Sequence, residues 1–298
     1  MAVTNAAPVV SVCIPAYNQE QFIAQAVESV LAQTFADFEL IVVDDASPDR
    51  TFEIVQSYRD PRIRVMRNPH NLGLEGNWNA ALAQARGAWI KILCGDDLLY
   101  PRCLERQLRS VRERAPSPVL ISCSRDIITP AGRKICTRRF ARHDGSLSGM
   151  KAIRRNIRSG TNLIGEPAAV LFRADVVAAS GPFYGGLPYL IDLDMWVRIL
   201  LQGDFVHLAE PLLAFRVSSG SLSFALANRQ SREYRQFIDR IRCLPDMNGI
   251  GGVDAAVGKI MSRGNMLLRK VFYAWYLARC TADNSGPLQA GREGASDL

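Results

Sequence analysis

Two adjacent carboxylates follow an apolar run in the segment KILCGDDLLYP, residues 91–101. Asp96 and Asp97 repel each other, so a bound cation is the partner that would hold both in one place. Mg²⁺ and Mn²⁺ prefer hard oxygen ligands, commonly one or two carboxylates with phosphate and water oxygens completing the shell. The pair therefore predicts a site for a divalent cation. Cys94 offers only a soft sulfur, and we expect it to pack inward as a residue of the strand.

Three more polar residues stand in the same position, directly after an apolar run. Tyr17 closes one such run, and Asp44 and Asp45 close the next. Between them, residues 20–33 show the spacing of apolar side chains that is typical of a helix. Apolar strands that alternate with helices predict a parallel sheet covered on both faces. Ligands bind beyond the carboxyl ends of such strands, so we expect these side chains to lie beside the acidic pair.

The rest of the chain continues as a mixture of helices and strands. Downstream of Pro101, the patterns predict a helix at 102–114, a strand at 118–124, a hairpin at 126–140 that turns at 130–132, a basic helix at 148–158, a strand and a helix within 165–180, an amphipathic helix at 192–203, two short strands around Glu210 and Pro211, and helices near 224–242 and 254–280. The tail at 281–298 is predicted to be disordered, because it has few apolar residues.

The composition is that of an ordinary soluble protein. The chain has 298 residues, 48% of them hydrophobic and 22% charged, which suits one large domain or two small ones. We expect neither a signal peptide nor a membrane span, because there is no basic leader and no apolar stretch of about 18 residues. Seven cysteines lie far apart without a C-x-x-C pair, which favours reduced thiols and a cytoplasmic location.

The net charge of +7 is unevenly distributed. Segment 102–158 holds fifteen Lys and Arg residues against four acidic ones. This excess predicts either an anionic partner, namely a lipid phosphate, a membrane surface or nucleic acid, or simply a solvated surface. Phe140 is the only aromatic residue in the segment, so base stacking is poorly supported and we expect no nucleic-acid partner. Peripheral contact with the inner face of a membrane, or a grip on a lipid-linked acceptor, fits the charge better.

Three blocks of the sequence, in this order, resemble the family 2 glycosyltransferases of GT-A fold. They are SVCIPAYNQEQFIAQAVESVLAQTFADFELIVVDDASPDRT, NLGLEGNWNAALAQARGAWIKILCGDDLLYP and IDLDMWVRILLQG. The resemblance covers about residues 9–220. It implies an α/β fold with a Rossmann-like, mostly parallel nucleotide-binding sheet flanked by helices. It places the GT-A catalytic domain at 1–223, with a nucleotide-sugar half (9–101) and an acceptor half (102–223), followed by a C-terminal helical extension at 224–280.

The same resemblance assigns roles to residues around the nucleotide sugar. Asp97 would be the direct ligand of Mn²⁺ or Mg²⁺, and Asp96 would contact the ribose or support the metal. The remaining assignments concern the base, the segment that closes over the nucleotide, and the diphosphate. Pro15, Ala16 and Tyr17 would line the base, and Asp45 would accept its ring N–H while Asp44 supports the loop. Asn79 and Gly73 would belong to the closing segment, with a turn glycine as the alternative for Gly73, and Arg216 with Ser221 or Ser223 would contact phosphate oxygens.

An inverting transfer needs a base that takes the proton of the acceptor hydroxyl, and such a base commonly contributes about 10²–10⁴ in rate. Asp192 matches the family's catalytic aspartate. Asp194 would point about 200° away on an ideal helix, so only one of the two can serve. Asp194 fits a helix-capping role better. We expect Trp196 to pack in the core, with the acceptor cleft as its alternative place.

The resemblance implies a UDP- or dTDP-sugar as donor, a glycan or a lipid-linked acceptor, and a role in the synthesis of surface polysaccharide or glycolipid. A nucleotidylyltransferase is disfavoured because the first loop lacks glycines and cations, and a dinucleotide-dependent oxidoreductase because G-x-G-x-x-G is absent. A non-catalytic relative that binds a nucleotide or an anionic lipid remains the alternative. The segment MLLRKVFYAWYLARC, 266–280, suits an interfacial helix, a homodimer contact or packing onto the catalytic domain.

Overall fold

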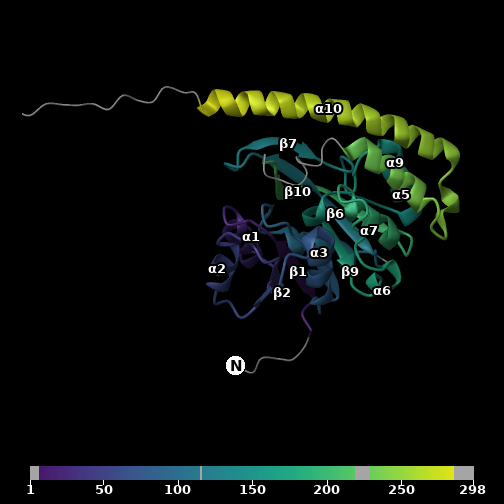
Figure 1. Ribbon diagram of the computed structural model, residues 1–298. Coiled ribbons are helices and arrows are strands. Elements are labelled where there is room, and N and C mark those ends of the chain that lie inside the picture. Colours follow the sequence, from purple (N-terminus) through teal and green to yellow (C-terminus); the bar gives the residue numbers. More distant parts are fainter. Residues whose placement is uncertain (1–6, 115, 219–228, 285–298) are drawn as a thin grey trace, which may run out of the picture.

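The computed structural model describes residues 7–114, 116–218 and 229–284, with side chains described as far as Val271. Figure 1 shows a central sheet with helices on both sides and one long helix along an edge of the molecule. The elements in chain order are β1 (Val10–Ala16), α1 (Ile23–Leu31), β2 (Phe38–Asp44), α2 (Thr51–Gln56), β3 (Ile63–Arg67), α3 (Gly73–Ala83), β4 (Trp89–Ile92), β5 (Leu98–Leu99), α4 (Cys103–Arg112), β6 (Leu120–Ile128), β7 (Lys134–Arg138), β8 (Gly145–Leu147), α5 (Gly149–Ser159), η1 (Pro167–Ala169), β9 (Val170–Arg173), α6 (Val177–Ser180), α7 (Ile191–Leu200), β10 (Phe205–Arg216), α9 (Gln230–Ile241), η3 (Met247–Gly249) and α10 (Gly252–Asn284).

The strands form one sheet in the order β3-β2-β1-β4-β9-β6-β10-β5, with β7 paired to β6 and β8 to β10. Strands β3, β2, β1 and β4 pair in parallel, and so do β6 and β10, whereas β9 runs antiparallel to both β4 and β6. Six of these strands therefore run in one direction. Ala16 and Asp44 are register partners at the ends of β1 and β2, so the polar residues that follow them meet at one edge of the sheet.

Two hydrophobic cores cover the two faces of the sheet. On one face, α1, α2 and α4 bury apolar side chains against the strands. On the other face, α3, α5, α7 and α9 do the same. Every residue of β1, β2 and β4 is buried. That is the pattern expected of parallel strands covered on both sides, and it explains why their sequences are continuous apolar runs.

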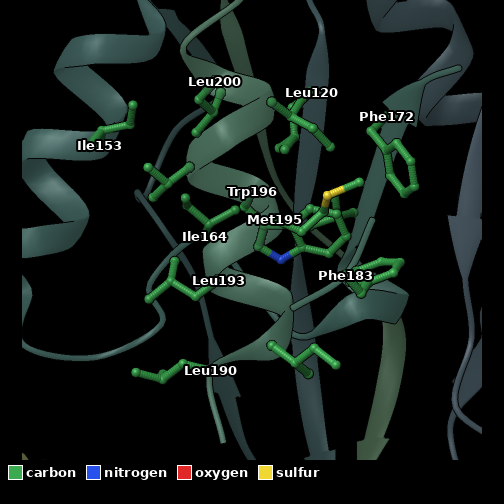
Figure 2. Close-up of a cluster of buried hydrophobic side chains, with 14 of the residues drawn as sticks. Leu120, Ile153, Ile164, Phe172, Phe183, Leu190, Leu193, Met195, Trp196 and Leu200 are labelled. Atoms are coloured by element: carbon green, nitrogen blue, oxygen red, sulfur yellow. The ribbon is translucent and has the colours of Figure 1, made fainter. Parts of the chain in front are cut away.

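Helix α7 is held by the second of these cores. Trp196 is fully buried, its ring lies 5.4 Å from that of Phe172, and its Nε1–H donates a hydrogen bond to the backbone oxygen of Gly165 over 3.1 Å. Figure 2 shows Trp196 among aliphatic and aromatic side chains of this cluster. The expectation of a core position for Trp196 is thus confirmed, and the ring fixes the helix that begins just before Asp192.

Two predictions about strands were wrong in detail. The two strands expected around Glu210 and Pro211 form one long strand, β10 (Phe205–Arg216), with register shifts on either side of Pro211. A proline has no N–H to donate, and the strand absorbs this through local irregularities instead of ending. Likewise, β4 ends at Ile92, so Asp96 and Asp97 lie in a turn between β4 and the short β5. The short β5 runs antiparallel to β10.

The basic segment 102–158 does not form a single surface. Helix α4 packs on the α1 side of the sheet, whereas α5 packs on the opposite side with α7 and α9. Several of its cations are paired within the fold, for example Arg106 with Glu210 at 2.8 Å. The charge of this segment is therefore divided between the two sides of the sheet, and its predicted contact with a membrane or a lipid-linked acceptor remains a prediction.

Helix α10 packs along α5 and α9, and in Figure 1 it runs along one edge of the molecule. Its bounds exceed the predicted 254–280 at both ends, and they include the first residues of the tail that was expected to be disordered. Residues 285–298 lie outside the described part, as do the side chains of 272–284. Within the described residues, no helix is both long and apolar enough to cross a membrane.

Candidate active site

The acidic turn is built between β4 and β10. Leu93 continues the pairing of β4 with β1 by donating its N–H to the oxygen of Cys13 over 2.9 Å. The chain then turns, and the N–H of Asp97 donates to the oxygen of Cys94 over 3.1 Å. From the end of β10, the N–H of Arg216 donates to Asp97 Oδ1 over 3.0 Å. The structure thus fixes one oxygen of Asp97 and leaves the other for a different partner.

The residues of this turn fit a divalent cation. Asp97 is fully buried, and its Oδ2 has no hydrogen-bond partner within the described part of the chain. Ligand atoms of Cys94, Asp96 and Asp97 all lie within 4.8 Å of one another. Burial, and then the neighbouring charge of Asp96, raises the pKa of Asp97 well above its ordinary value. A buried carboxylate oxygen that lacks a donor is the arrangement that a hard cation satisfies.

Cys94 differs partly from its expected place. It packs against the core as predicted, but it follows the end of β4 and its sulfur also borders the two carboxylates. Burial raises the pKa of the Cys94 thiol well above its ordinary value, and the negative charges of Asp97, Asp96, Asp192 and Glu166 add to this effect. A protonated thiol is a poor ligand for Mg²⁺ or Mn²⁺.

Arg216 lies under the acidic turn. Its guanidinium is buried, donates to the oxygen of Asp96 over 2.8 Å and to Gln25 Oε1 over 2.8 Å, also donates to the oxygen of Pro130, and stacks 4.4 Å above the ring of Phe22. These contacts make Arg216 a positioning residue for the turn. The predicted contact with phosphate remains a prediction. Ser221 and Ser223, expected beside it, lie outside the described residues.

Asp45 organises the start of α3. Its Oδ1 accepts hydrogen bonds from Asn68 Nδ2 over 2.7 Å and from the N–H of Leu72 over 2.9 Å, and its Oδ2 accepts from the N–H of Gly73 over 3.0 Å. Gly73 has a φ of 73°, a conformation that a side chain would strain. Asp45 therefore holds the segment that was expected to close over the nucleotide, and its predicted contact with the base stays untested.

Asp44 behaves as predicted for a residue that supports the loop. Its Oδ2 accepts the N–H of Ser47 over 3.1 Å and lies 3.2 Å from Nε of Arg67. The carboxylate is fully buried, so the two contacts tie the turn after β2 to the neighbouring strand β3. This turn lies beside the residues that follow β1, since the N–H of Asn18 donates to Ser47 Oγ over 3.0 Å.

The segment after β1 presents one exposed ring. Pro15 and Ala16 are buried at the strand end, and Tyr17 is 47% exposed. Asn77 lies behind them, donating from Nδ2 to the oxygen of Ala16 over 3.2 Å and accepting from Asn68 over 3.2 Å. An exposed tyrosine at the carboxyl end of a parallel strand is well placed to stack on a base.

Asn79 lies elsewhere. Its side chain makes a pair of hydrogen bonds with the backbone of Phe183, donating to the oxygen over 3.1 Å and accepting the N–H over 2.8 Å. Asn77, two positions earlier on α3, is the asparagine that the structure brings to Asp45, through Asn68. Side chains two apart on a helix point in very different directions, and the sequence offered two asparagines without a reason to prefer the first.

Asp192 lines a cavity with a volume of about 310 Å³. It lies in the first turn of α7. Its Oδ1 accepts a hydrogen bond from the N–H of Leu193, and its Oδ2 accepts one from Asn162 Nδ2, each over 2.7 Å. Burial raises its pKa to about 7; the hydrogen bond from Leu193 lowers it, and the charge of Glu166 raises it further. A carboxylate with such a pKa can exchange a proton near neutral pH, as a general base must.

The sequence reasoning missed a group of charged residues in the same cavity. Arg125 is fully buried and forms an ion pair with Glu166, which also pairs with Arg138 at 3.3 Å. Glu166, Arg138 and Asn162 line the cavity together with Asp192. Burial alone would raise the pKa of Glu166, but Arg125 and Arg138 bring it below its ordinary value. Only the glycine and proline beside Glu166 in the sequence hinted at a special turn.

The acidic turn and Asp192 belong to one region. The thiol of Cys94 experiences the charges of Asp97, Asp96 and Asp192, and Glu166 acts on both Asp97 and Asp192. The structure therefore holds two kinds of carboxylate that influence each other electrostatically: a pair suited to a hard cation, and Asp192, whose pKa suits proton transfer. The arrangement can stabilise an anionic leaving group on one side and deprotonate a hydroxyl on the other.

Asp194 is held inside the fold by two ion pairs. It is fully buried, with Oδ2 at 2.9 Å from Arg198 Nε on the same helix and Oδ1 at 2.9 Å from Arg240 Nε on α9. The pair with Arg240 joins α7 to α9. This geometry favours Asp192 over Asp194 as the base.

Replacing Asp194 by asparagine should therefore lower stability and spare the chemistry. Removing one partner of a buried ion pair costs about 3–5 kcal/mol, so the variant should unfold at clearly lower denaturant concentration. Because Asp194 does not line the cavity, turnover at a temperature where the variant is folded should change less than about tenfold. Equilibrium unfolding in urea and steady-state rates would measure both effects, and a normal unfolding midpoint with lost turnover would contradict this division of roles.

Comparison with known proteins gives a consistent result. Residues 11–178 match the family model described as Glycosyl transferase family 2. The chain is 32% identical over 251 residues to Uncharacterized protein MT1568 of Mycobacterium tuberculosis, covering 82% of this chain and 77% of the relative. It is 28% identical over 231 residues to Uncharacterized glycosyltransferase RT0329 of Rickettsia typhi, covering 76% and 69%. Putative teichuronic acid biosynthesis glycosyltransferase TuaG of Bacillus subtilis is 40% identical over 114 residues, 38% of this chain and 45% of TuaG.

Solved structures share the fold. S. aureus TarS 1–349 in complex with UDP superposes with a TM-score of 0.60 at 21% identity, covering 81% of this chain and 74% of that one. Mannosyltransferase PcManGT from Pyrobaculum calidifontis, in complex with GDP-Man and Mn²⁺, superposes with a TM-score of 0.60 at 18% identity, covering 95% and 77%. At these identities the likeness concerns the fold.

Proposed function

Because the chain belongs to the family 2 glycosyltransferases, we propose that it moves a sugar from a UDP- or dTDP-sugar to an acceptor hydroxyl with inversion at the anomeric carbon. The resemblance seen in the sequence is confirmed, and so is the α/β fold of GT-A type. The observation that carries the proposal is the pairing of two carboxylate sites: Asp97 Oδ2 is buried without a hydrogen-bond partner among the described residues, and Asp192 lines a cavity of about 310 Å³.

The chemistry proposed is a single in-line displacement. The acceptor oxygen forms a bond to the anomeric carbon while the bond from that carbon to the diphosphate oxygen breaks. Asp192 takes the proton of the attacking hydroxyl, and the electron pair of the broken bond leaves with the nucleoside diphosphate. Hydrogen bonds from Leu193 and Asn162 hold both oxygens of Asp192, which orients the carboxylate for proton transfer.

The acidic turn supplies the electrostatics on the leaving-group side. Asp97 and Asp96 would hold Mn²⁺ or Mg²⁺, and the bound ion would neutralise the charge that develops on the diphosphate. Arg216 holds the turn in place from below through Asp97 Oδ1 and the oxygen of Asp96. The unpartnered Oδ2 of Asp97 supports this assignment.

The nucleoside is proposed to lie at the ends of β1 and β2. Tyr17 offers an exposed ring for stacking, and Asp45 holds the backbone of Leu72 and Gly73 beside it. TarS is found with UDP and PcManGT with GDP-Man and Mn²⁺, which supports a nucleoside diphosphate donor. The acceptor is proposed to be a glycan or a lipid-linked saccharide in polysaccharide synthesis, a class suggested by the name of TuaG.

A donor screen tests the proposal. The chain would be heated with UDP-, dTDP- and GDP-sugars in the presence of Mn²⁺, Mg²⁺ or a chelator, and the melting temperature recorded. A preferred donor at about 100 times its dissociation constant should add about 2.7 kcal/mol of stability, and the chelator should remove most of it. The released sugar, followed by NMR, should first appear with the inverted configuration.

Each part of the proposal has its own contrary outcome. If no nucleotide sugar stabilises the chain, the donor assignment is wrong. A product that first appears with the retained configuration would exclude a single displacement. Binding without any turnover, with donor hydrolysis equal in the wild-type chain and in the Asp192→Asn variant, would instead identify a non-catalytic nucleotide-binding relative.

A further inference from the structure

Helix α10 exposes a row of large aliphatic side chains. Val253, Ile260, Leu267 and Val271 are each more than 60% exposed. The first three are seven residues apart and the fourth follows after four, so at about 3.6 residues per turn they form one stripe along the helix. Leu268 and Met261 widen the stripe on one side, and both are exposed as well. We call these six residues the α10 face.

The opposite side of the same helix is the one that packs. Ala255 and Ser262 are buried, and a Cβ at Gly258 would meet the backbone oxygen of Ile157 on α5. Asn265 donates a hydrogen bond to the oxygen of Ser159 over 2.8 Å. The α10 face therefore points away from the body of the protein, which agrees with the position of α10 along one edge in Figure 1. Contiguous exposed apolar surface on such a scale marks an interaction site.

Cations accompany the α10 face. Arg263 and Lys270 are exposed and stand three residues after Ile260 and Leu267, on one flank of the stripe. Helix α5 packs against the opposite side of α10, where Arg154 and Arg158 pair with Asp254, so the flank of the α10 face consists of Arg263 and Lys270. An apolar stripe with cations on its flank is the pattern of a helix that lies in the interface of a membrane with anionic lipids. We propose that the α10 face docks onto an anionic lipid surface.

The charges favour a lipid surface over a second copy of this chain. A helix pair needs apolar residues at alternating spacings of three and four along its seam. The row Val253, Val257, Ile260, Gly264, Leu267 and Val271 has these spacings, with Arg263 and Lys270 along one edge and Met261 and Leu268 along the other. A second copy packed along this row would therefore offer the two cations no acidic partner. The same two residues lie toward the headgroups when the α10 face enters a membrane surface, where each is attracted by anionic lipid.

Docking of this face has a consequence for the acceptor, and that consequence rests on the proposed function. Leu268 belongs to the α10 face and also lines the cavity that contains Asp192, together with Arg269 and Asn265. Docking would bring this rim of the cavity to the lipid surface. An acceptor anchored in the membrane could then present its hydroxyl to Asp192 without leaving the bilayer. The acceptor class that fits is a lipid-linked saccharide.

Vesicle sedimentation with the full chain tests the docking. The probes are phosphatidylcholine vesicles with and without phosphatidylglycerol. The wild-type chain should bind the anionic vesicles at least about tenfold more tightly than the neutral ones, and high salt should weaken binding by screening. Ile260→Asn with Leu267→Asn should lose at least about tenfold in affinity for the anionic vesicles, and Arg263→Gln with Lys270→Gln should lose less and show a weaker salt dependence.

The matched control is Ala36→Glu with Gln56→Glu, since both residues are exposed on the α1 and α2 side of the protein. This control lowers the net charge by two, as Arg263→Gln with Lys270→Gln does, and should bind almost like the wild type. Equal binding to both kinds of vesicle, or full binding by the Ile260→Asn and Leu267→Asn variant, would overturn the proposal. So would a dimer in sedimentation equilibrium that this variant dissociates, because the α10 face would then contact a second copy.

Hydrolysis of the nucleotide sugar without vesicles separates this inference from the proposed function. None of the four α10 residues changed in the variants lines the cavity, so hydrolysis should be unaffected by their replacement. Normal hydrolysis in a chain that ignores anionic vesicles would overturn the docking alone. Vesicle binding in a chain that hydrolyses no donor would leave the docking in place and contradict the proposed reaction.

Discussion

Replacing Asp192 by asparagine should slow sugar transfer by about 10²–10⁴-fold, the usual contribution of a general base. The carboxylate lies in the cavity with both oxygens hydrogen-bonded, so the amide can occupy the same place but cannot accept the proton. Donor binding should be little changed, because the proposed nucleotide contacts lie at the ends of β1 and β2. Steady-state rates with donor and acceptor, together with donor titration, would separate the two effects, and Asp194→Asn is the matched control from the same helix turn.

The pH dependence follows from the same residue. Since burial raises the pKa of Asp192 to about 7, the fraction of ionised base falls below that pH, and kcat/KM should fall with it. The Asp192→Asn variant should lack this limb of the profile. A wild-type rate that stays flat from about pH 5 to pH 8 would contradict the assignment of Asp192 as the base.

The raised pKa of Asp192 should also make the free energy of unfolding depend on pH. The rate should rise with pH, whereas the stability of the wild type should fall. In the folded protein Asp192 holds its proton up to a pH of about 7, whereas in the unfolded chain it loses the proton near its ordinary value. The stability that the neutral form provides is complete below the unfolded pKa and is lost as the pH rises through about 7. The free energy of unfolding of Asp192→Asn, relative to the wild type, should therefore rise from pH 4 to pH 8 by on the order of 3–4 kcal/mol. The asparagine side chain accepts fewer hydrogen bonds than the carboxylate, which adds a difference in stability that is the same at every pH. The diagnostic quantity is therefore the change of the stability difference with pH.

Replacing Asp97 by asparagine should reduce kcat/KM by about 10³-fold or more, since a metal ion contributes several kcal/mol to stabilising the leaving group. The amide oxygen can still accept the N–H of Arg216, which now donates to Asp97 Oδ1, so the turn should persist. The oxygen that has no partner in the described residues is replaced by an NH₂ group, which cannot bind a cation. Calorimetric titration of Mn²⁺ in the presence of UDP should detect no binding in this variant.

Cys94→Ser is the control for the acidic turn. Its sulfur lies within the same 4.8 Å group as the two carboxylates, yet a protonated thiol contributes little to holding Mg²⁺ or Mn²⁺. We therefore expect metal-dependent activity within about threefold of the wild type. Full activity of Asp97→Asn, or an unchanged wild-type rate after chelation of metal ions, would remove the cation from the mechanism.

Local patterns in the sequence were sufficient for the elements that carry the donor side. The strands β1 and β2 are buried on both faces, so their sequences are continuous apolar runs, and the first polar residue after each run marks the strand end. Asp45 and Asp97 could be singled out because they follow apolar runs and by resemblance to the family, and Asp192 by the resemblance. The helix α7 was equally visible, because its apolar periodicity is local.

Contacts between distant segments could not be predicted in the same way. Arg125, Arg138 and Glu166 meet across tens of residues, and no local spacing encodes that meeting. Arg216 matched a phosphate-binding position, but the packing of β10 against the acidic turn directs its guanidinium beneath that turn. The choice between Asn77 and Asn79 depended on which side of α3 faces the end of β1.

The sequence by itself determined the family, the order of strands and helices in the donor half, and the residue types at the strand ends. Strand ends and helix periods are properties of neighbouring residues, so they are readable without the fold. The tertiary structure alone decided how the two carboxylates of α7 are engaged: Asp194 pairs with Arg198 and Arg240, whereas Asp192 lines the cavity. It also decided that α10 turns an apolar face outward beside that cavity. Both outcomes depend on how helices pack against the sheet, and the packing is fixed only when the whole chain has folded.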